Sequence, residues 1–293
     1  MPPARTVAEI AELLPYLFLA WPEAKKKQVR EWLKFGSVEV NGRVVTQFNH
    51  RLKPGDRVSI RARGLAAPDT VLPGGIRIRH EDADLLVIEK PAGLLSIASA
   101  SEPDKTAYAD LTDHVRQGNR LSRARVWIVH RLDRETSGLM VFAKSEAAKV
   151  ALQAGWEAVE KKYLAVVEGA PPGEAGLLDS HLDEANPLKV YVDKEGPQTR
   201  HALTRYRTMK RGGATTLVEL TLLTGRRHQI RVQLAEVGCP IVGDKKYGAK
   251  TNPLKRVALH ACELRLHHPV TGKELRFYSP LPGDLGELVR VGS

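Results

Sequence analysis

The sequence predicts an α+β protein in which a large mixed, mostly antiparallel sheet with flanking helices carries the site on its loops. Short apolar runs rich in β-branched residues, typical of buried strands, alternate with amphipathic helical patterns. The 293 residues are long enough for two unequal domains, and a stretch rich in Pro, Gly and Ala at 62–75 resembles a linker. We therefore expect a small domain at 1–65, a linker at 66–75 and the larger domain at 76–293.

The composition indicates a cytoplasmic protein with a polyanionic partner. The formal net charge is +11, which favours nucleic acid, although a solvated basic surface would give the same excess. Cys239 and Cys262 lack the spacing of a metal site or a disulfide framework, so we expect reduced thiols. No apolar run approaches the roughly 18 residues of a membrane helix. The segment 7–20 contains acidic residues and does not resemble a secretory signal.

The loop at 130–138 is the main candidate for a functional site. It reads His-Arg-Leu-Asp-Arg-Glu-Thr-Ser-Gly and lies between two predicted buried strands, 126–129 and 139–143. Reactive side chains on such a rigid frame are typical of catalytic loops. Asp133 is flanked by Arg131 and Arg134, and nearby positive charge favours the ionised carboxylate. A structural ion pair that fixes the loop is the alternative, because such networks also perturb carboxylates.

The string His-Arg-Leu-Asp-x-x-Thr-Ser-Gly-Leu at 130–139 resembles the signature of the RluA-type RNA pseudouridine synthases. In that family the Asp is the catalytic residue, a role that the resemblance assigns to Asp133. The strand predicted at 160–169 resembles the second family motif, which implies that Tyr163 packs on the uracil or takes its C5 proton, although a strand Tyr is more often core packing. The resemblance also implies the family's pseudouridine synthase fold, with Arg131 helping to hold a base that has left its stack.

A third motif, Thr-Gly-Arg-Arg-His-Gln-Ile-Arg-Val at 224–232, opens a helix that we expect to end at Gly238. In the family the Arg after Gln-Ile pairs with the catalytic Asp, which implies this role for Arg231. Arg226 and Arg227 are predicted in the first turn, where free N–H groups favour a phosphate. A solvated turn is the alternative for both. Gln233 departs from the His that relatives commonly carry.

The N-terminal part predicts an RNA-binding unit. Apolar residues at 7–18 have helical spacing with a kink or break at Pro15, and a second helix is expected from Pro22 to before Gly36. A hairpin with an Asn-Gly turn at 38–45 and a turn at 53–56 follow. This order resembles the α-L RNA-binding domain of the ribosomal protein S-four type. The predicted second helix carries a basic face that would contact RNA phosphates, or else is merely solvated, formed by Lys26, Arg30 and Lys34.

Further elements are predicted between these motifs and after them. They are a strand at 84–90, a turn at 91–93, a surface loop at 96–104, a helix at 107–116, a helix capped by Ser145 and running to about 160, a polar insertion at 171–200, a strand at 217–223 and closing strands at 258–261 and 268–272. The family resemblance extends from the N-terminal unit to about Pro282. The His residues of the tail do not follow metal-ligand spacing with carboxylates, so packing or hydrogen bonding is favoured over metal binding.

The resemblance implies an RNA pseudouridine synthase, which we expect to need neither cofactor nor metal and to work as a monomer. The RNA is expected to be ribosomal, with transfer RNA as the alternative. Two other classes are weighed against this one. A non-catalytic RNA-binding protein is disfavoured by the intact Asp133, Tyr163 and Arg231. A glycosidase would need a second carboxylate near Asp133, for which Glu135 is the close candidate in sequence.

Overall fold

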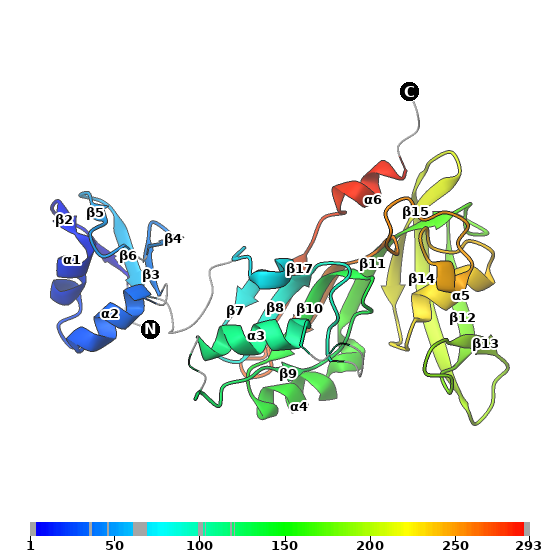
Figure 1. Cartoon of the computed structure of the whole chain (residues 1–293), viewed down its shortest axis with the longest axis horizontal. Helices are drawn as coiled ribbons and strands as arrows, with labels where there is room; N and C mark the ends of the chain where they lie inside the picture. The colour runs from blue at the N-terminus through cyan, green and yellow to red at the C-terminus, as the bar shows by residue number, and fades with distance from the viewer. Residues whose placement is uncertain are drawn as a thin grey trace.

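The computed structural model describes residues 4–34, 37–45, 47–60, 69–98, 102, 104–117, 119 and 121–289. Its N-terminal unit packs two helices, α1 (Leu13–Ala20) and α2 (Lys26–Lys34), against small antiparallel sheets (Figure 1). The strands are β1 (Arg5–Thr6), β2 (Ala11–Glu12), β3 (Val38–Val40), β4 (Arg43–Val44), β5 (Arg51–Leu52) and β6 (Arg57–Ile60). Trp21 and Trp32 meet edge to face in the core, with ring centroids 6.3 Å apart.

Both predicted helices of this unit start later than expected. Helix α1 begins at Leu13 because β1 and β2 occupy the segment before it, and Ile10 is exposed. Pro15 lies in the first turn of α1, where its missing N–H costs no hydrogen bond, so no kink follows. Helix α2 begins four residues after Pro22, which lies in a turn.

The predicted hairpin and turn of the N-terminal unit are confirmed. Strands β3 and β4 pair antiparallel across Asn41 and Gly42, which both have positive φ as a type I′ turn requires. The Asp56 amide donates to the Lys53 carbonyl and closes the next turn. Gly36, before which the second helix was expected to end, lies outside the described residues. The identity of this unit as an α-L domain stays a prediction.

The second part is built on one mixed sheet of 11 strands, as the fold prediction required. Its main path runs β13-β12-β14-β15-β11-β16-β10-β8-β7, with β17 beside β16 and β9 beside β10 (Figure 1). All pairs are antiparallel except the short parallel contact between β10 and β16. The strands are β7 (Arg77–Glu81), β8 (Leu85–Lys90), β9 (Trp127–Ile128), β10 (Ser137–Ala143), β11 (Glu160–Glu168), β12 (Ala175–Asp183), β13 (Tyr191–Asp193), β14 (Thr199–Arg211), β15 (Thr215–Leu222), β16 (Leu259–His267) and β17 (Glu274–Tyr278).

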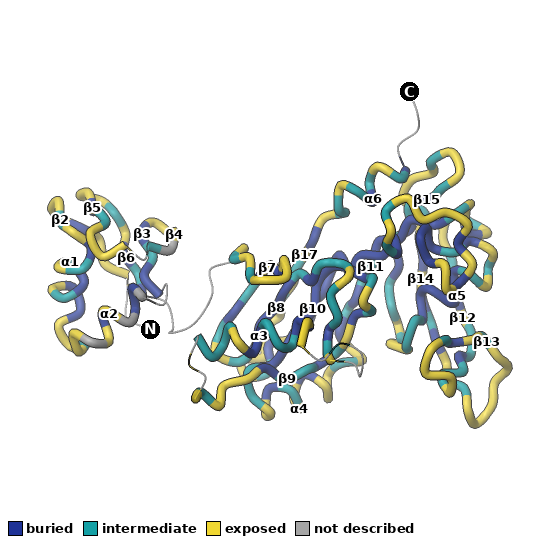
Figure 2. The backbone as a smooth tube through the Cα atoms, in the orientation of Figure 1, coloured by how far each residue is buried: buried dark blue, intermediate teal, exposed yellow. Residues whose placement is uncertain are grey.

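Strand β10 is buried along its whole length because helices cover both faces (Figure 2). On one face Met140 and Phe142 pack with α3 (Ala107–Arg116). On the other face Val141 packs with α4 (Glu146–Ala154), whose first turn is capped by the Ser145 hydroxyl. A strand that is covered on both faces needs apolar side chains at successive positions, which explains the continuous apolar run at 139–143 from which this strand was predicted.

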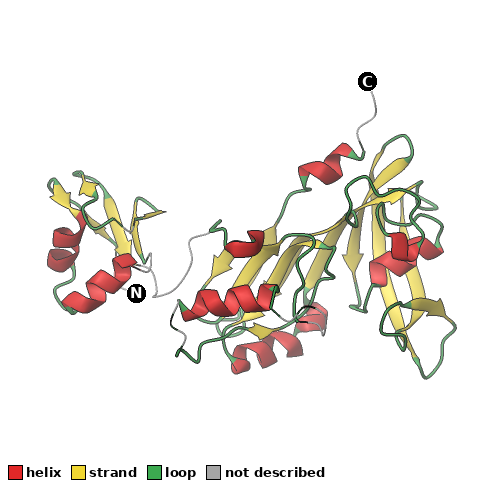
Figure 3. Cartoon of the chain, viewed as in Figure 1, coloured by secondary structure: helices red, strands yellow, loops and turns green. Residues whose placement is uncertain are grey.

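Helix α5 (Gln229–Glu236) covers the half of the sheet that contains β12, β14 and β15 (Figure 3). Its Ile230 and Leu234 pack against buried residues of those strands, such as Val218 and Leu220. The predicted helix start at 224 is wrong: 224–228 form a turn that ends with His228 in the left-handed region, at φ 54°.

Other predictions of local structure need correction. The polar insertion at 171–200 folds as β12, β13 and the start of β14, since one face of β12 packs on the core and the other faces solvent. Helix α4 ends at Ala154, and a 3-10 turn follows it. Segment 268–272 is the turn between β16 and β17 rather than a strand. A short C-terminal helix, α6 (Gly283–Glu287), closes the described chain.

The predicted linker is only partly described. Residues 69–75 are tied to the second part: Val71 bridges Arg77, and Asp69 pairs with Arg79 at 2.8 Å. Residues 62–68 lie outside the described chain, so the domain boundaries stay a prediction. No helix among the described residues is long and apolar enough to cross a membrane.

Candidate active site

The loop that carries Asp133 is fixed from both sides. The Thr136 amide donates to the Asp133 carbonyl and closes a turn, after which β10 begins. On the other side Ser96 is buried, its hydroxyl donating to the Leu132 carbonyl at 2.6 Å and accepting from the Leu132 amide. Ser96 is therefore part of the site scaffold, whereas the sequence predicted it in a surface loop, and residues 99–101 and 103 of that loop are not described.

Gly138 must be glycine for this loop to meet the sheet. Its φ is +115°, and a Cβ atom at this position would lie 2.2 Å from the Ala261 carbonyl oxygen. That carbonyl belongs to β16, which pairs with β10 at this point. The close approach brings the loop to the junction between the two halves of the sheet.

Lys90 lies beneath the loop with its side chain fully buried. Its ammonium donates to the carbonyls of Pro91, Leu94 and Arg134, and so joins the turn after β8 to the residue that follows Asp133. Burial lowers the pKa of Lys90 to about 7, and the negative charge of Asp133 opposes that shift. The sequence placed Lys90 at the end of a predicted strand, without this role.

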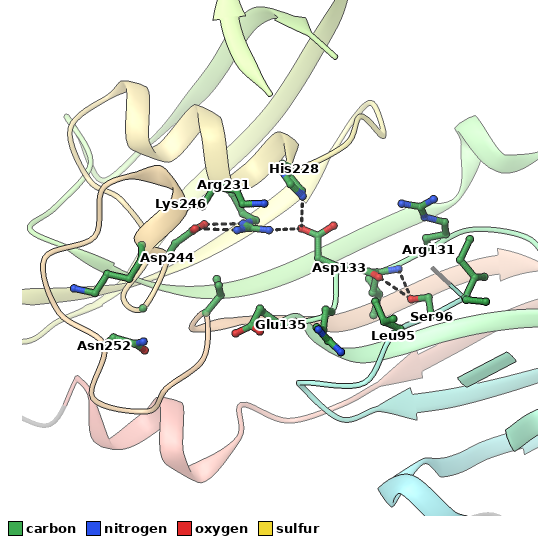
Figure 4. Close-up of a pocket in the computed structure, with 17 residues that line it drawn as sticks. Leu95, Ser96, Arg131, Asp133, Glu135, His228, Arg231, Asp244, Lys246 and Asn252 are labelled. Atoms are coloured by element: carbon green, nitrogen blue, oxygen red, sulfur yellow. Dashed lines mark hydrogen bonds and ion pairs between the residues drawn. The ribbon is translucent and has the colours of Figure 1, made fainter. Parts of the chain in front are cut away.

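Arg231 comes from α5, 98 residues along the chain, and donates through Nη1 to Oδ2 of Asp133 at 2.9 Å (Figure 4). Its Nε and Nη2 bind Asp244 at 2.6 and 2.9 Å. Arg231 is 6% exposed, and although burial disfavours its charge, the two carboxylates raise its pKa above the ordinary value. The pairing that the resemblance implied for Arg231 is therefore present in the structure.

Asp244 is a site residue that the sequence reasoning passed over. It is 1% exposed and accepts both hydrogen bonds in the two-pronged geometry that fixes a guanidinium plane. The signal available was its place at the end of a family-like turn, Pro-Ile-Val-Gly-Asp at 240–244. Because Asp244 holds two of the three nitrogens of Arg231, the remaining Nη1 is aimed at Asp133.

Two adjoining hollows open at Asp133. The larger, of about 580 Å³, is lined by Leu95–Ala98, Arg131–Glu135 and the 243–246 turn. The smaller, of about 70 Å³, is lined by Asp133, Arg231 and Tyr163 among others. Burial, together with the charge of Asp133, raises the pKa of Tyr163 above its ordinary value, so its phenol stays protonated near neutral pH. Glu135 lines the larger hollow, but Figure 4 shows its carboxylate turned away from Asp133.

His228 is a second basic neighbour of Asp133; the sequence reasoning placed it beside Arg226 and Arg227 in the expected first turn and did not link it to this carboxylate. Its Nε2 lies 3.8 Å from Oδ2 of Asp133, and its Nδ1 lies 2.8 Å from the Tyr247 hydroxyl. Burial lowers the pKa of His228 to about 4. The ring is therefore neutral near pH 7.

Three further arginines of the prediction, which lie outside the N-terminal unit, differ in placement. Arg131 is exposed and lines both hollows. Arg226 is exposed, with Nε donating to the His201 carbonyl. Arg227 donates to the carbonyls of Glu184, Asn186 and Pro187, so its guanidinium holds that loop rather than facing solvent.

Arg226 and Arg227 both precede α5, so their expected place in its first turn is wrong, while phosphate contact by the two residues stays a prediction. The helix begins only at Gln229, and His228 occupies the position before it. Gln233, the departure from the family, is buried. It bonds Thr204 and Ser180 and the carbonyls of Leu178 and Ala202, and so ties α5 to the sheet.

The predicted basic face of α2 is described in part. Lys26 and Arg30 are exposed, while Val29 and Leu33 are buried on the opposite side. Lys34 ends α2, but its side chain lies outside the described part. These residues line neither of the two hollows at Asp133.

Asp82, Asp84 and His268 lie close enough to hold a metal ion. However, His268 Nδ1 accepts from the amides of Val270 and Thr271, which leaves the ring proton on Nε2, 3.1 Å from Asp82. A metal at Nε2 would require the loss of that proton while both amides still donate to Nδ1. The cluster is thus explained by hydrogen bonding.

The mixed sheet thus presents an Asp–Arg pair in a hollow, the arrangement of a candidate active site that works through a carboxylate. A family model described as RNA pseudouridylate synthase matches residues 84–236, which include Asp133, Tyr163 and Arg231. The chain belongs to this family, of the RluA type, and is an RNA pseudouridine synthase.

Individual relatives agree with this assignment. The "Uncharacterized RNA pseudouridine synthase YlyB" of Bacillus subtilis is 36% identical over 271 residues, with 90% of this chain and 88% of that protein covered. "Ribosomal large subunit pseudouridine synthase D" of Xanthomonas campestris is 36% identical over 291 residues, covering 92% and 85%. A solved structure, "Human RNA Pseudouridylate Synthase Domain Containing 4", is similar with TM-score 0.59 and 28% identity, covering 71% of this chain and 90% of the other.

Proposed function

We propose that this chain converts specific uridines of large-subunit ribosomal RNA to pseudouridine, with Asp133 as the catalytic carboxylate. Relatives named as ribosomal large subunit pseudouridine synthases, at 33–36% identity over most of the chain, support the ribosomal substrate. A cytoplasmic location follows from that substrate. Transfer RNA is the alternative substrate.

The observation that carries the proposed site is the Asp133 carboxylate paired with Arg231 at 2.9 Å where two hollows meet. The reaction breaks the bond between C1′ and N1, turns the uracil and joins C1′ to C5. The C5 proton is then lost and N1 gains a proton, so no oxidant or reductant is consumed. A carboxylate oriented by a guanidinium suits the attack or the stabilisation that this exchange requires.

The remaining residues take supporting roles in this proposal. Tyr163 packs on the uracil, because its protonated phenol borders the smaller hollow beside Asp133. Arg131, exposed at the rim of both hollows, holds the nucleotide that has left its stack. Lys26 and Arg30 contact phosphates elsewhere on the RNA, a sequence-independent contribution to affinity.

The test compares Asp133→Asn with Glu135→Gln, a matched loss of charge two residues along the same turn. Activity is followed by release of tritium from uridine labelled at C5 in a transcript of large-subunit ribosomal RNA. Asp133→Asn should lose at least about a hundredfold in rate with RNA binding retained, as for an essential nucleophile or charge. Glu135→Gln should keep most of the activity. A rate for Asp133→Asn above a hundredth of wild type would withdraw the assignment.

The substrate is tested separately by mapping pseudouridine in total RNA from a strain that lacks the gene. Sites missing from large-subunit ribosomal RNA, and restored by the wild-type chain but not by Asp133→Asn, are the expected result. Loss of sites in transfer RNA alone would replace the proposed substrate with the alternative.

A further inference from the structure

The hydrogen bonds around His228 determine which ring nitrogen carries its proton. The Tyr247 hydroxyl oxygen accepts from the Val190 amide at 3.0 Å, which leaves the hydroxyl proton for His228 Nδ1 at 2.8 Å. With Nδ1 as acceptor, the single proton of the neutral ring lies on Nε2. The contact at Nε2 supports the same assignment, because Nε2 faces the Asp133 carboxylate. The negative carboxylate attracts an N–H group at this position and would repel a nitrogen lone pair.

Both basic partners of Asp133 approach the same oxygen. Arg231 Nη1 lies 2.9 Å and His228 Nε2 lies 3.8 Å from Oδ2. Among the described residues no hydrogen bond or ion pair reaches Oδ1, and Figure 4 shows the second carboxylate oxygen free of these contacts. The two oxygens are therefore unequal: one is held and one is left for the reaction.

The surroundings of His228 keep its ring neutral. Burial lowers its pKa to about 4, and the positive charges of Arg231, Lys246 and Arg227 add to that shift, while Asp133 opposes it. Tyr247 packs edge-on against the ring, and Lys189 Nζ lies over the Tyr247 ring, 5.6 Å from its centroid. The backbone of His228 is also held at φ 54°, a conformation that non-glycine residues rarely adopt.

We propose that His228 is a positioning residue, held by Tyr247 as the neutral ring with its proton on Nε2, which together with Arg231 fixes Oδ2 of Asp133 and leaves Oδ1 as the reacting oxygen. The inference rests on the proposed catalytic role of Asp133. The neutral ring matters because a doubly protonated ring would form a full ion pair with Asp133 and compete with its reaction.

The first test is Tyr247→Phe, which keeps the ring but removes the proton donor to Nδ1. Burial and the neighbouring positive charges still oppose a second proton, but the loss of the donor opens Nδ1 to it, so the pKa of the ring should rise above about 4. The single-turnover tritium-release rate of the variant, relative to that of wild type, should therefore fall about threefold or more between pH 8 and pH 5, as a titrating His requires. Wild type should show no such fall from His228 in this range.

The double variant Tyr247→Phe with His228→Gln decides the cause. Glutamine keeps a polar N–H group but cannot take up a proton, so the acid fall should disappear. A Tyr247→Phe profile parallel to that of wild type, or an acid fall that persists in the double variant, would overturn the proposal. A merely structural role of Tyr247 would lower the rate without creating a pH dependence that needs the imidazole.

A second measurement reads the protonated nitrogen in the wild-type ring itself. The ¹⁵N chemical shifts of the His228 ring in the full-length protein, assigned by comparison with His228→Gln, report which nitrogen is protonated at pH 7. Protonated Nε2 with unprotonated Nδ1 is expected, and the reverse would refute the proposal. An active Asp133→Asn would instead refute the proposed function while leaving the ring measurement untouched, so the two failures are distinguishable.

Discussion

Replacing Arg231 tests the charge arrangement of the site most directly. Its guanidinium makes three charge-assisted hydrogen bonds, one to Asp133 and two to Asp244. Removing one partner of a buried ion pair costs about 3–5 kcal/mol, because the other charge stays buried without compensation. Asp244 is 1% exposed and falls in that class, while the side chain of Asp133 is 25% exposed, so its share should be smaller.

Arg231→Met should therefore lower the free energy of unfolding by about 3–5 kcal/mol, mostly through Asp244. Combining it with Asp244→Asn removes the stranded charge and should recover most of that loss, as measured by denaturant unfolding. The double variant separates stability from catalysis, because Asp133 still lacks its guanidinium. Arg231→Lys keeps a positive charge but cannot bind both carboxylates in the two-pronged geometry, so it should be impaired yet active.

The catalytic result is expected in single-turnover tritium release by the double variant. Without the guanidinium, Oδ2 of Asp133 loses its charge-assisted hydrogen bond, so tritium release should be at least about a hundredfold slower than in wild type. A double variant with a rate near that of wild type would show that Arg231 does not orient the Asp133 carboxylate for the reaction.

Three further predictions concern other parts of the chain. Lys26→Ala with Arg30→Ala should weaken RNA binding and reduce the slope of log affinity against log salt by about 0.7–0.9 for each lost phosphate contact. Lys90 has a folded-state pKa of about 7 against an ordinary 10.5, so the unfolded chain binds more protons between these values. Stability relative to Lys90→Met should therefore rise with pH in this window, by at most about 1.4 kcal/mol per unit. Gly138→Ala should cost at least about 3 kcal/mol, since its Cβ would meet a β16 carbonyl at a strained φ.

Each of these has a control within the chain. An unchanged salt slope would mean that Lys26 and Arg30 do not touch RNA, and Lys273→Ala, an exposed charge on the turn before β17, serves as the comparison. A stability difference for Lys90→Met that stays flat or falls with pH would mean that the three carbonyl acceptors keep the ammonium charged. Gly248→Ala has a similar φ, +92°, but no atom near the added Cβ, so it should cost much less than Gly138→Ala.

The local elements that the sequence predicted well are those whose cause is itself local. The continuous apolar run of β10 identified a strand buried on both faces, and Asn41 with Gly42 identified the hairpin turn. Helix α3 has the predicted bounds, 107–116, because a Thr106 cap and a left-handed Gln117 delimit an amphipathic stretch. The long loop motif at 130–139 likewise predicted the family, which the comparisons confirm.

Local patterns failed where distant segments decide the outcome. The insertion at 171–200 is polar because β12 exposes one face, and only pairing with β14 makes it a strand. The start of α5 depends on Glu184 and Gln229, which bond the turn at Arg226 and Arg227 and hold it out of the helix.

The residues of the candidate site show the same contrast between local and tertiary causes. The sequence by itself determined that Asp133 lies on a rigid loop, and the family motif supplied Arg231 as its partner. Tertiary structure alone decided that Asp244 aims the guanidinium, that Lys90 and Ser96 hold the loop from below, and that Tyr247 sets the proton on His228. The physical reason is that hydrogen-bond direction and desolvation depend on which atoms of remote segments meet, and no spacing within one segment encodes that.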